Sequence, residues 1–267
     1  MAGAGTRAMG VRMMANLIAC RILSYGNYQH RAWTHLSEIG IRNVEMPIPP
    51  VEQRAEVKKK LADNGLAVTT LQSLCDVTLP NAVEIMRPQL EACVEFGARY
   101  CFLSAKAKGT DLATVCERLA AIGDRACGLG VTVVLETHPD LVTNGDVGRQ
   151  TMEAISHPNV RINFDTANLY FYNRGVTAVG ELAKVIDYVA SVHLKESTGK
   201  FDEWVFPTLG TGVVDFPQIF RTLNARGFAG PCTMELEGTK GVEFDEAGQL
   251  KYIADSAAYL RRIGALT

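Results

Sequence analysis

Short runs of apolar residues recur along the chain, and longer stretches with helical spacing of apolar positions separate them. The runs have the length of β-strands, and the stretches between them have the length of helices. We predict strands at residues 14–20, 42–46, 67–71, 100–104, 132–136, 161–165, 191–195 and 233–237. This alternation is typical of a parallel sheet whose strands are joined by crossover helices.

The stretches between the runs also carry signals for helix ends. The clearest predicted helices cover residues 51–64, 82–97, 112–129 and 216–227. A glycine stands at or near the end of each, namely Gly65, Gly97, Gly130 and Gly227. Glycine enters the left-handed conformation of a helix C-terminal cap at little cost, so these positions indicate where helices end and strands begin.

The number of strand-and-helix units in 267 residues predicts an α/β fold, a single (β/α)8 TIM barrel. An open doubly wound sheet would show a similar alternation, but no GxGxxG motif follows the first predicted strand. No linker or low-complexity segment divides the chain. We therefore expect a loose tail at residues 1–10 and one barrel domain at residues 11–267.

Composition and charge narrow the functional classes. Hydrophobic residues make up 47% of the chain, which is enough for a large core, and we predict no membrane segment. The net charge of -2, without a concentrated basic face, argues against nucleic acid as a partner. The seven cysteines are scattered and form no CxxC pair, which indicates buried thiols and a reducing, cytoplasmic location.

Each of the last four predicted strands carries an ionisable residue near its carboxyl end. Because side chains alternate between the two faces of a strand, the apolar neighbours of these residues should face outward, toward the helices. The inward set then holds Glu136, Asp165, His193 and Glu235. Barrel enzymes place their chemistry at this end of the strands, so we expect the four side chains to converge.

Four ionisable side chains at one barrel mouth are costly to desolvate unless a cation neutralises them. We therefore predict that Glu136, Asp165, His193 and Glu235 bind one divalent metal ion. Three carboxylates and one imidazole favour Mn²⁺, with Mg²⁺ or Co²⁺ as alternatives, over Zn²⁺. Taken singly, each residue also has a structural interpretation, as a helix cap, a solvated loop residue or a core histidine.

Four short motifs resemble those of the sugar phosphate isomerase/epimerase superfamily, which is xylose isomerase-like. They are LETH at residues 135–138, NFDTAN at 163–168, VHLKE at 192–196 and MELE at 234–237. The superfamily includes ketose 3-epimerases, hydroxypyruvate isomerases, inosose dehydratases and, more distantly, endonuclease IV. The resemblance covers essentially the whole predicted barrel and implies the TIM barrel fold, a metal site and a homo-oligomer, either a dimer or a tetramer.

By resemblance to the ketose 3-epimerases, the four predicted ligands occupy metal positions, and Glu136 and Glu235 also occupy the positions of the catalytic acid/base pair. Asn168 stands where those enzymes have a histidine that contacts the substrate. Endonuclease IV binds three zinc ions through several further histidines, whereas this chain has five histidines in all. A DNA-repair site of that kind is therefore the weaker alternative.

Three further residues are candidates for substrate binding. His138 lies two positions beyond Glu136 and would face the same cavity if the strand continued, although Pro139 favours a turn. Lys195 either steadies an oxyanion or reaches solvent, and Glu45 either binds a substrate hydroxyl or pairs with a cation in the barrel wall. The long connection at 201–206 and 209–212 is either a lid over the mouth or a cap of the barrel.

These observations predict an enzyme that moves a proton next to a carbonyl in a small, carbohydrate-like substrate. A metal would stabilise an enediolate, while one of the two glutamates removes a proton and the other returns one. The product would be an epimer or an isomer. The same enediolate can instead lose a hydroxyl group, which makes a lyase of the dehydratase type the alternative, and a non-catalytic binding barrel is a third interpretation.

Overall fold

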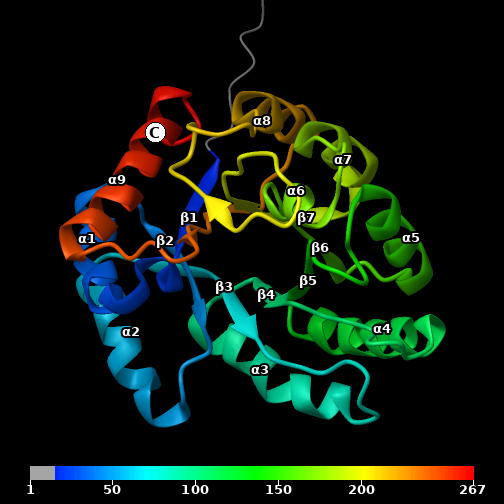
Figure 1. Cartoon of the computed structure of the whole chain (residues 1–267). Coiled ribbons are helices and arrows are strands. Elements are labelled where there is room, and N and C mark those ends of the chain that lie inside the picture. Colours follow the sequence, from blue (N-terminus) through cyan, green and yellow to red (C-terminus); the bar gives the residue numbers. More distant parts are fainter. Residues whose placement is uncertain (1–15) are drawn as a thin grey trace, which may run out of the picture.

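The computed structural model describes residues 16–267, and its strands form a closed parallel barrel (Figure 1). The strands are β1 (Leu17–Arg21), β2 (Asn43–Pro47), β3 (Ala67–Ser73), β4 (Tyr100–Leu103), β5 (Thr132–Glu136), β6 (Val160–Asp165), β7 (Val189–Leu194) and β9 (Pro231–Met234). They pair in this order, and β9 returns to β1 to close the ring. The predicted (β/α)8 TIM barrel is confirmed, whereas the predicted tail at residues 1–10 lies outside the described residues.

Helices surround the barrel on its outer side (Figure 1). They are α1 (Ala32–Glu38), α2 (Arg54–Asp63), α3 (Ala82–Phe96), α4 (Leu112–Gly128), α5 (Gly145–Ile155), α6 (Asn168–Tyr172), α7 (Ala178–Val185), α8 (Phe216–Ala225) and α9 (Glu246–Arg262). Three 3-10 segments join them, η1 (Ile22–Arg31), η2 (Val51–Gln53) and η3 (Ile186–Tyr188). Among the described helices, none is long and apolar enough to cross a membrane.

The predicted helix ends agree with the structure to within a few residues, and the four glycines take the expected left-handed conformation. Their φ angles are 60° at Gly65, 70° at Gly97, 67° at Gly130 and 66° at Gly227. The prediction at 51–64 differs at its start, because the first three residues form the 3-10 turn η2 before α2 begins.

The last two barrel strands end earlier than predicted, so two site residues, Lys195 and Glu235, lie just beyond them. β7 ends at Leu194 and β9 ends at Met234. The backbone N–H of Lys195 donates to the Thr166 hydroxyl (3.0 Å) instead of joining the sheet. A side chain therefore ends the ladder where the chain turns away from the barrel.

The core lies in the layer between the strands and the helices, as the alternation of side chains predicts. Val133, Ile162, Val192 and Met234, from the last four barrel strands, are each 0% exposed in this layer. The opposite faces of these strands therefore carry the inward set, which includes all the predicted metal ligands.

A second, two-stranded sheet lies beyond the carboxyl ends of the barrel strands. β8 (Val205–Phe206) pairs antiparallel with β10 (Gly238–Thr239), which follows β9. This pairing places part of the predicted lid or cap segment at the barrel mouth. The neighbouring stretch at 209–212 takes no part in the lining of the mouth.

Candidate metal centre and active site

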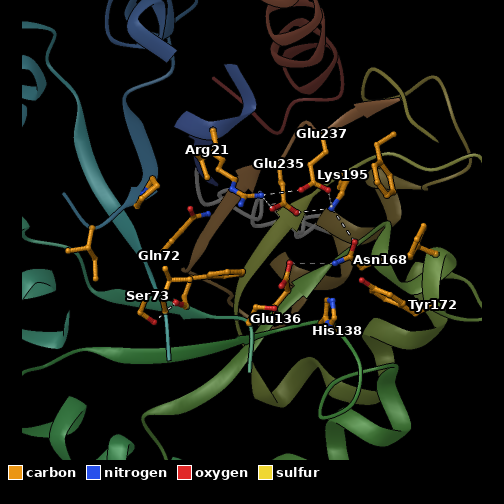
Figure 2. Close-up of a pocket in the computed structure, with 18 of the residues that line it drawn as sticks. Arg21, Gln72, Ser73, Glu136, His138, Asn168, Tyr172, Lys195, Glu235 and Glu237 are labelled. Carbon is orange, nitrogen blue, oxygen red and sulfur yellow. Dashed lines mark hydrogen bonds and ion pairs between the residues drawn. The ribbon is translucent and has the colours of Figure 1, made fainter. Parts of the chain in front are cut away.

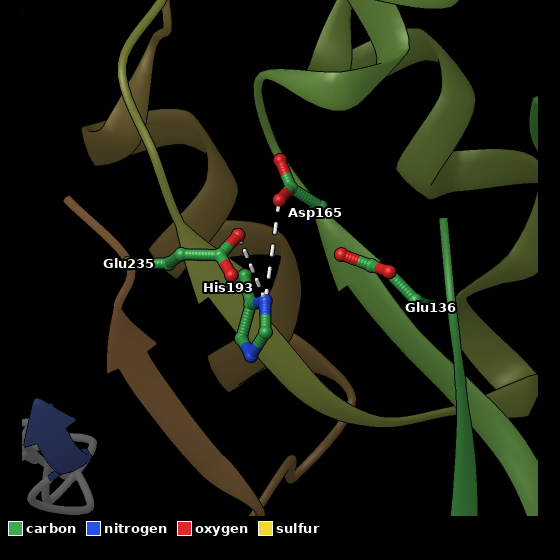
Figure 3. A group of neighbouring side chains, drawn as sticks. All are labelled: Glu136, Asp165, His193 and Glu235. Carbon is green, nitrogen blue, oxygen red and sulfur yellow. Dashed lines mark ion pairs between the residues drawn. The ribbon is translucent and has the colours of Figure 1, made fainter. Parts of the chain in front are cut away.

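Four ionisable side chains converge at the carboxyl end of the barrel (Figure 3). Glu136 and Asp165 end β5 and β6, His193 lies in β7, and Glu235 follows β9. One ligand atom from each residue lies within 4.8 Å of the others, and Asp165, His193 and Glu235 are at most 1% exposed. The structure thus brings together the four residues that the sequence predicts as metal ligands.

Two buried atoms in this cluster have no hydrogen-bond partner among the described residues. They are Asp165 Oδ2 and His193 Nδ1. His193 Nδ1 lies 3.2 Å from Glu235 Oε2 and 4.0 Å from Asp165 Oδ2, so the unpartnered atoms face the same point. Buried polar atoms without partners are costly, and a divalent cation would satisfy both at once. The donor set of three carboxylates and one imidazole fits such an ion.

The His193 ring is fixed on its other sides. Its Nε2 lies 3.1 Å from both oxygens of the buried Glu45, and Phe102 stacks on the ring at 5.1 Å between centroids. Gln72 donates to Glu45 Oε1 (2.8 Å), which holds the carboxylate in turn. With the proton assigned to Nε2, the Nδ1 lone pair points into the metal cluster.

Glu45 does not line the cavity above the cluster, although we predicted that it contacts the substrate. Its contacts indicate that it positions the His193 ring. The substrate contact stays a prediction.

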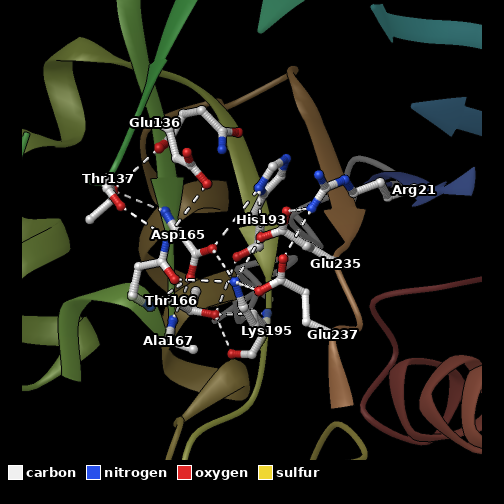
Figure 4. A network of polar contacts seen from close by, with 12 residues as sticks. Arg21, Glu136, Thr137, Asp165, Thr166, Ala167, His193, Lys195, Glu235 and Glu237 are labelled. Atoms are coloured by element: carbon white, nitrogen blue, oxygen red, sulfur yellow. Dashed lines mark hydrogen bonds and ion pairs between the residues drawn. The ribbon is translucent and has the colours of Figure 1, made fainter. Parts of the chain in front are cut away.

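Lys195 is buried and lies among acidic side chains (Figure 4). Its Nζ lies 3.0 Å from Glu235 Oε2, 2.5 Å from Glu237 Oε2 and 3.5 Å from Asp165 Oδ2. The ammonium also donates to Asn168 Oδ1 (3.1 Å). Lys195 therefore neutralises part of the acidic cluster and ties Asn168 to it.

Arg21 is a site residue that the sequence analysis missed. It ends β1, and its Nη1 forms ion pairs with Glu235 and, at 3.4 Å, with Glu237. The sequence does contain a signal for Arg21, because this charged residue follows an apolar run, as the ionisable residues of the last four predicted strands do.

The two predicted catalytic glutamates have different electrostatic surroundings. Burial raises the pKa of Glu136, and the nearby Glu235 carboxylate raises it further. Burial alone would raise the pKa of Glu235 as well, but Lys195, His193 and Arg21 outweigh it and hold this pKa well below its usual range. Glu136 thus retains a proton more readily than Glu235 does.

A cavity of about 570 Å³ opens above the cluster (Figure 2). Five predicted site residues line it, namely Glu136, His138, Asn168, Lys195 and Glu235. The sequence analysis did not identify other polar lining residues, which include Gln72, Ser73, Ser104 and Tyr172. Most of these come from the ends of β3 and β4, where no ionisable residue marks the strand end.

His138 and Asn168 both line this cavity. His138 Nδ1 lies 2.6 Å from the Pro139 carbonyl oxygen, its ring packs edge-to-face on Tyr172, and burial lowers its pKa. Asn168 donates to the Thr137 carbonyl (3.0 Å) and lies 3.5 Å from Glu136 Oε1. Both side chains can therefore present polar atoms to a ligand near Glu136.

Comparisons with known proteins agree with this geometry. The family model "Xylose isomerase-like TIM barrel" matches residues 33–263. The chain is 30% identical over 223 residues to a ketose 3-epimerase of Arthrobacter globiformis, a match that covers 74% of each protein. It is 28% identical over 160 residues to an inosose dehydratase of Geobacillus thermodenitrificans, where the match covers 54% of this chain and 51% of the relative.

Solved structures show the same fold. An L-ribulose 3-epimerase superposes with a TM-score of 0.75 at 19% identity, and the match covers 94% of each chain. A xylose isomerase-like TIM barrel protein of Mycobacterium smegmatis, solved in complex with magnesium, superposes with a TM-score of 0.72 at 19% identity. That match covers 94% of this chain and 97% of the other.

Proposed function

Since the chain belongs to the xylose isomerase-like TIM barrel family, we propose that it is a divalent-metal-dependent isomerase or epimerase of a small polyhydroxy carbonyl compound. The observation that carries this proposal is the buried cluster of Glu136, Asp165, His193 and Glu235, which contains two unpartnered atoms. Two residues of the cluster, Glu136 and Glu235, line a cavity large enough for a sugar-sized ligand.

Glu136, Asp165, His193 and Glu235 would hold the metal ion. When bound, the ion supplies Lewis-acid stabilisation of negative charge on substrate oxygens. Mn²⁺ is the preferred ion, with Mg²⁺ or Co²⁺ as alternatives, because oxygen donors dominate the site. The similar Mycobacterium smegmatis protein was solved with magnesium, which supports a hard divalent ion.

Glu136 and Glu235 are the proposed acid/base pair, because both line the cavity and come from different sides of the cluster. Glu235 is the preferred acceptor of the proton bound to carbon, because nearby cations hold its pKa below the usual range, and Glu136, whose pKa is raised by burial, is the preferred group to return a proton. Lys195, Asn168 and His138 would orient substrate oxygens around the pair. A 3-epimerisation needs the two proton transfers on opposite faces of one carbon.

A dehydratase is the second candidate, supported by the similarity to an inosose dehydratase. The same proton removal by Glu235 would then be followed by loss of a hydroxyl group, for which Glu136 can donate the proton. The match to the ketose 3-epimerase is longer and covers more of both chains, so epimerisation is our first choice.

The remaining expectations are also proposals. We infer a carbohydrate-like small molecule as the ligand, no nucleic-acid or membrane partner, a cytoplasmic location and a homo-oligomer. The structure describes a single chain, and the epimerase and dehydratase relatives support the substrate class alone.

The experiment that tests this function is proton exchange in deuterated water. The Mn²⁺-loaded protein is incubated with free ketoses and an inosose, and NMR detects deuterium at carbon while mass spectrometry detects the loss of water. We expect metal-dependent exchange that Glu136→Gln and Glu235→Gln each reduce by at least about 100-fold. His157→Asn, at the opposite end of the barrel, is the control. Metal binding without exchange or water loss on any compound would contradict the proposal.

A further inference from the structure

The cavity above the metal cluster has two apolar walls. The aliphatic wall follows β1 to β3 and consists of Leu23, Pro47, Ile48 and Leu74. The aromatic wall lies between the ends of β6 and β8 and consists of Phe171, Tyr172, Trp204 and Phe206. Because β2 and β6 stand opposite each other in the ring of eight strands, the two walls face each other across the mouth.

The aliphatic wall contains an exposed side chain on a fixed backbone. Leu74 is 86% exposed, more than any other large hydrophobic side chain in the described part of the chain. Its N–H donates to Gln89 Oε1 (2.8 Å), and its carbonyl accepts from Gln89 Nε2 (2.9 Å). The two bonds hold Leu74 at the rim, although its side chain has almost no contact with the protein.

The aromatic wall is also held in place. Trp204 packs edge-to-face against Phe206 at 5.3 Å and against Phe171 at 5.7 Å between ring centroids. The Trp204 carbonyl accepts from the N–H of Lys240 (3.0 Å), next to the β8–β10 pair. Trp204 is 41% exposed, so part of its ring remains available to a ligand.

A simple sugar would gain little binding free energy from contact with these two walls. Each of its hydroxyl groups needs a hydrogen-bond partner when it leaves water, and of the eight wall side chains only Tyr172 and Trp204 carry a polar group. An apolar group in the same place gains free energy in proportion to the area that it buries. The polar groups needed for hydroxyls are instead concentrated on the floor, around Glu136 and Glu235.

We propose that the substrate is a polyhydroxy carbonyl compound with an aryl or branched alkyl substituent, which lies between the aliphatic and aromatic walls. This inference rests on the proposed function, because it assumes that the carbonyl end reaches Glu136 and Glu235. The substituent would cover Leu74 and Trp204, which are exposed large hydrophobic members of the two walls.

Two matched probes test the proposal on the Mn²⁺-loaded protein. 2-Hydroxyacetophenone and hydroxyacetone share a carbonyl with an adjacent hydroxyl, and they differ in a phenyl group against a methyl group. Isothermal titration should show that the phenyl probe binds at least about ten-fold more tightly. Leu74→Ala and Trp204→Ala should each reduce this preference by about three-fold or more. Val94→Ala, an exposed apolar position on α3 outside the cavity, should leave it unchanged.

Equal affinities for the two probes would overturn the proposal, as would a preference that survives both wall substitutions. Circular dichroism confirms that each variant is folded. Proton exchange at the CH₂OH carbon of each probe, followed by NMR, separates this proposal from the proposed function. Exchange with equal affinities would contradict the substituent subsite alone. A phenyl preference without exchange would support the subsite and count against the proton transfer.

Discussion

Residues outside the four-residue cluster fix the orientation of the His193 ring. Glu45 contacts Nε2 with both oxygens, and Phe102 covers one face of the ring, so the ring has little freedom to turn. A histidine ligand usually depends on such a partner for its tautomer. Glu45 is 148 positions away in the chain, and its role follows only from the closed barrel.

We predict that Glu45→Gln lowers Mn²⁺ affinity by roughly 10–100-fold. The new amide can donate to Nε2, which moves the ring proton to Nδ1 and removes the lone pair that faces the metal cluster. Isothermal titration measures the affinity, and the ¹⁵N shifts of His193 report the tautomer. Glu181→Gln is a matched control, because Glu181 is a buried carboxylate bonded to Gly145 and Lys184. Unchanged affinity and tautomer in the Glu45 variant would refute the role.

A second histidine makes stability depend on pH. His35 on α1 lies 2.8 Å from the Tyr25 hydroxyl, and burial lowers its pKa. The folded state therefore binds a proton less readily than the unfolded state, whose histidine has a pKa of about 6.5. The stabilisation is complete above this value and decreases as the pH falls below it.

We expect His35→Gln to flatten the pH dependence of the unfolding free energy between pH 7 and 5. The wild type loses the stabilisation of neutral His35 in this range, whereas glutamine does not titrate. Urea unfolding at a series of pH values measures the effect, with His30→Gln at an exposed position of η1 as the control. Parallel pH curves for the wild type and His35→Gln would contradict the assignment.

At the scale of elements, one carboxylate organises the loop that follows β8. Glu196 is 1% exposed and accepts from the N–H groups of Ser197 (3.0 Å), Gly210 (2.8 Å) and Val214 (3.0 Å). These bonds explain why the stretch at 209–212, which we considered as part of a lid, is a fixed part of the barrel end. Its geometry depends on a side chain rather than on a strand or helix.

Glu196→Ala should lower the unfolding free energy by roughly 2–4 kcal/mol, because three N–H groups, two of them buried, lose their acceptor. Hydrogen exchange at Gly210 and Val214 should become faster than in the wild type. Glu196→Gln keeps one acceptor oxygen and should have a smaller effect. Equal exchange rates in the wild type and the alanine variant would show that other contacts hold the loop.

The same scale explains what could be predicted from sequence. The barrel strands can be identified from sequence because every second residue of a strand is apolar and packs against the helices. This alternation is a local signal that repeats every two residues. The end of β7 was predicted too late, since the Thr166 hydroxyl, a non-local partner, takes the N–H of Lys195. Ladder ends of this kind depend on neighbours that are distant in sequence.

For the whole molecule, the site residues that were missed are those defined by contacts across the closed barrel. Arg21 pairs with Glu235 over 214 positions, and this contact exists because β1 and β9 close the ring. The four proposed metal ligands were predictable because each one lies at or next to the carboxyl end of a strand and faces inward. The two apolar walls were not, since their residues come from strand ends, short elements and loops that share no repeating pattern.

The closed barrel also couples metal binding to global stability. The four ligands come from β5, β6, β7 and the end of β9, so an ion held by them cross-links half of the ring in the folded state alone. At free Mn²⁺ about 100-fold above its dissociation constant, the unfolding free energy should rise by about 2.7 kcal/mol. For a chain of this size, the melting temperature should rise by roughly 5–10 °C.

Differential scanning calorimetry with and without chelator measures this shift. Glu235→Gln should abolish it, while Glu181→Gln should retain it. A shift that persists in Glu235→Gln would place the stabilising ion elsewhere, because an ion bound to this cluster needs the Glu235 carboxylate as a ligand.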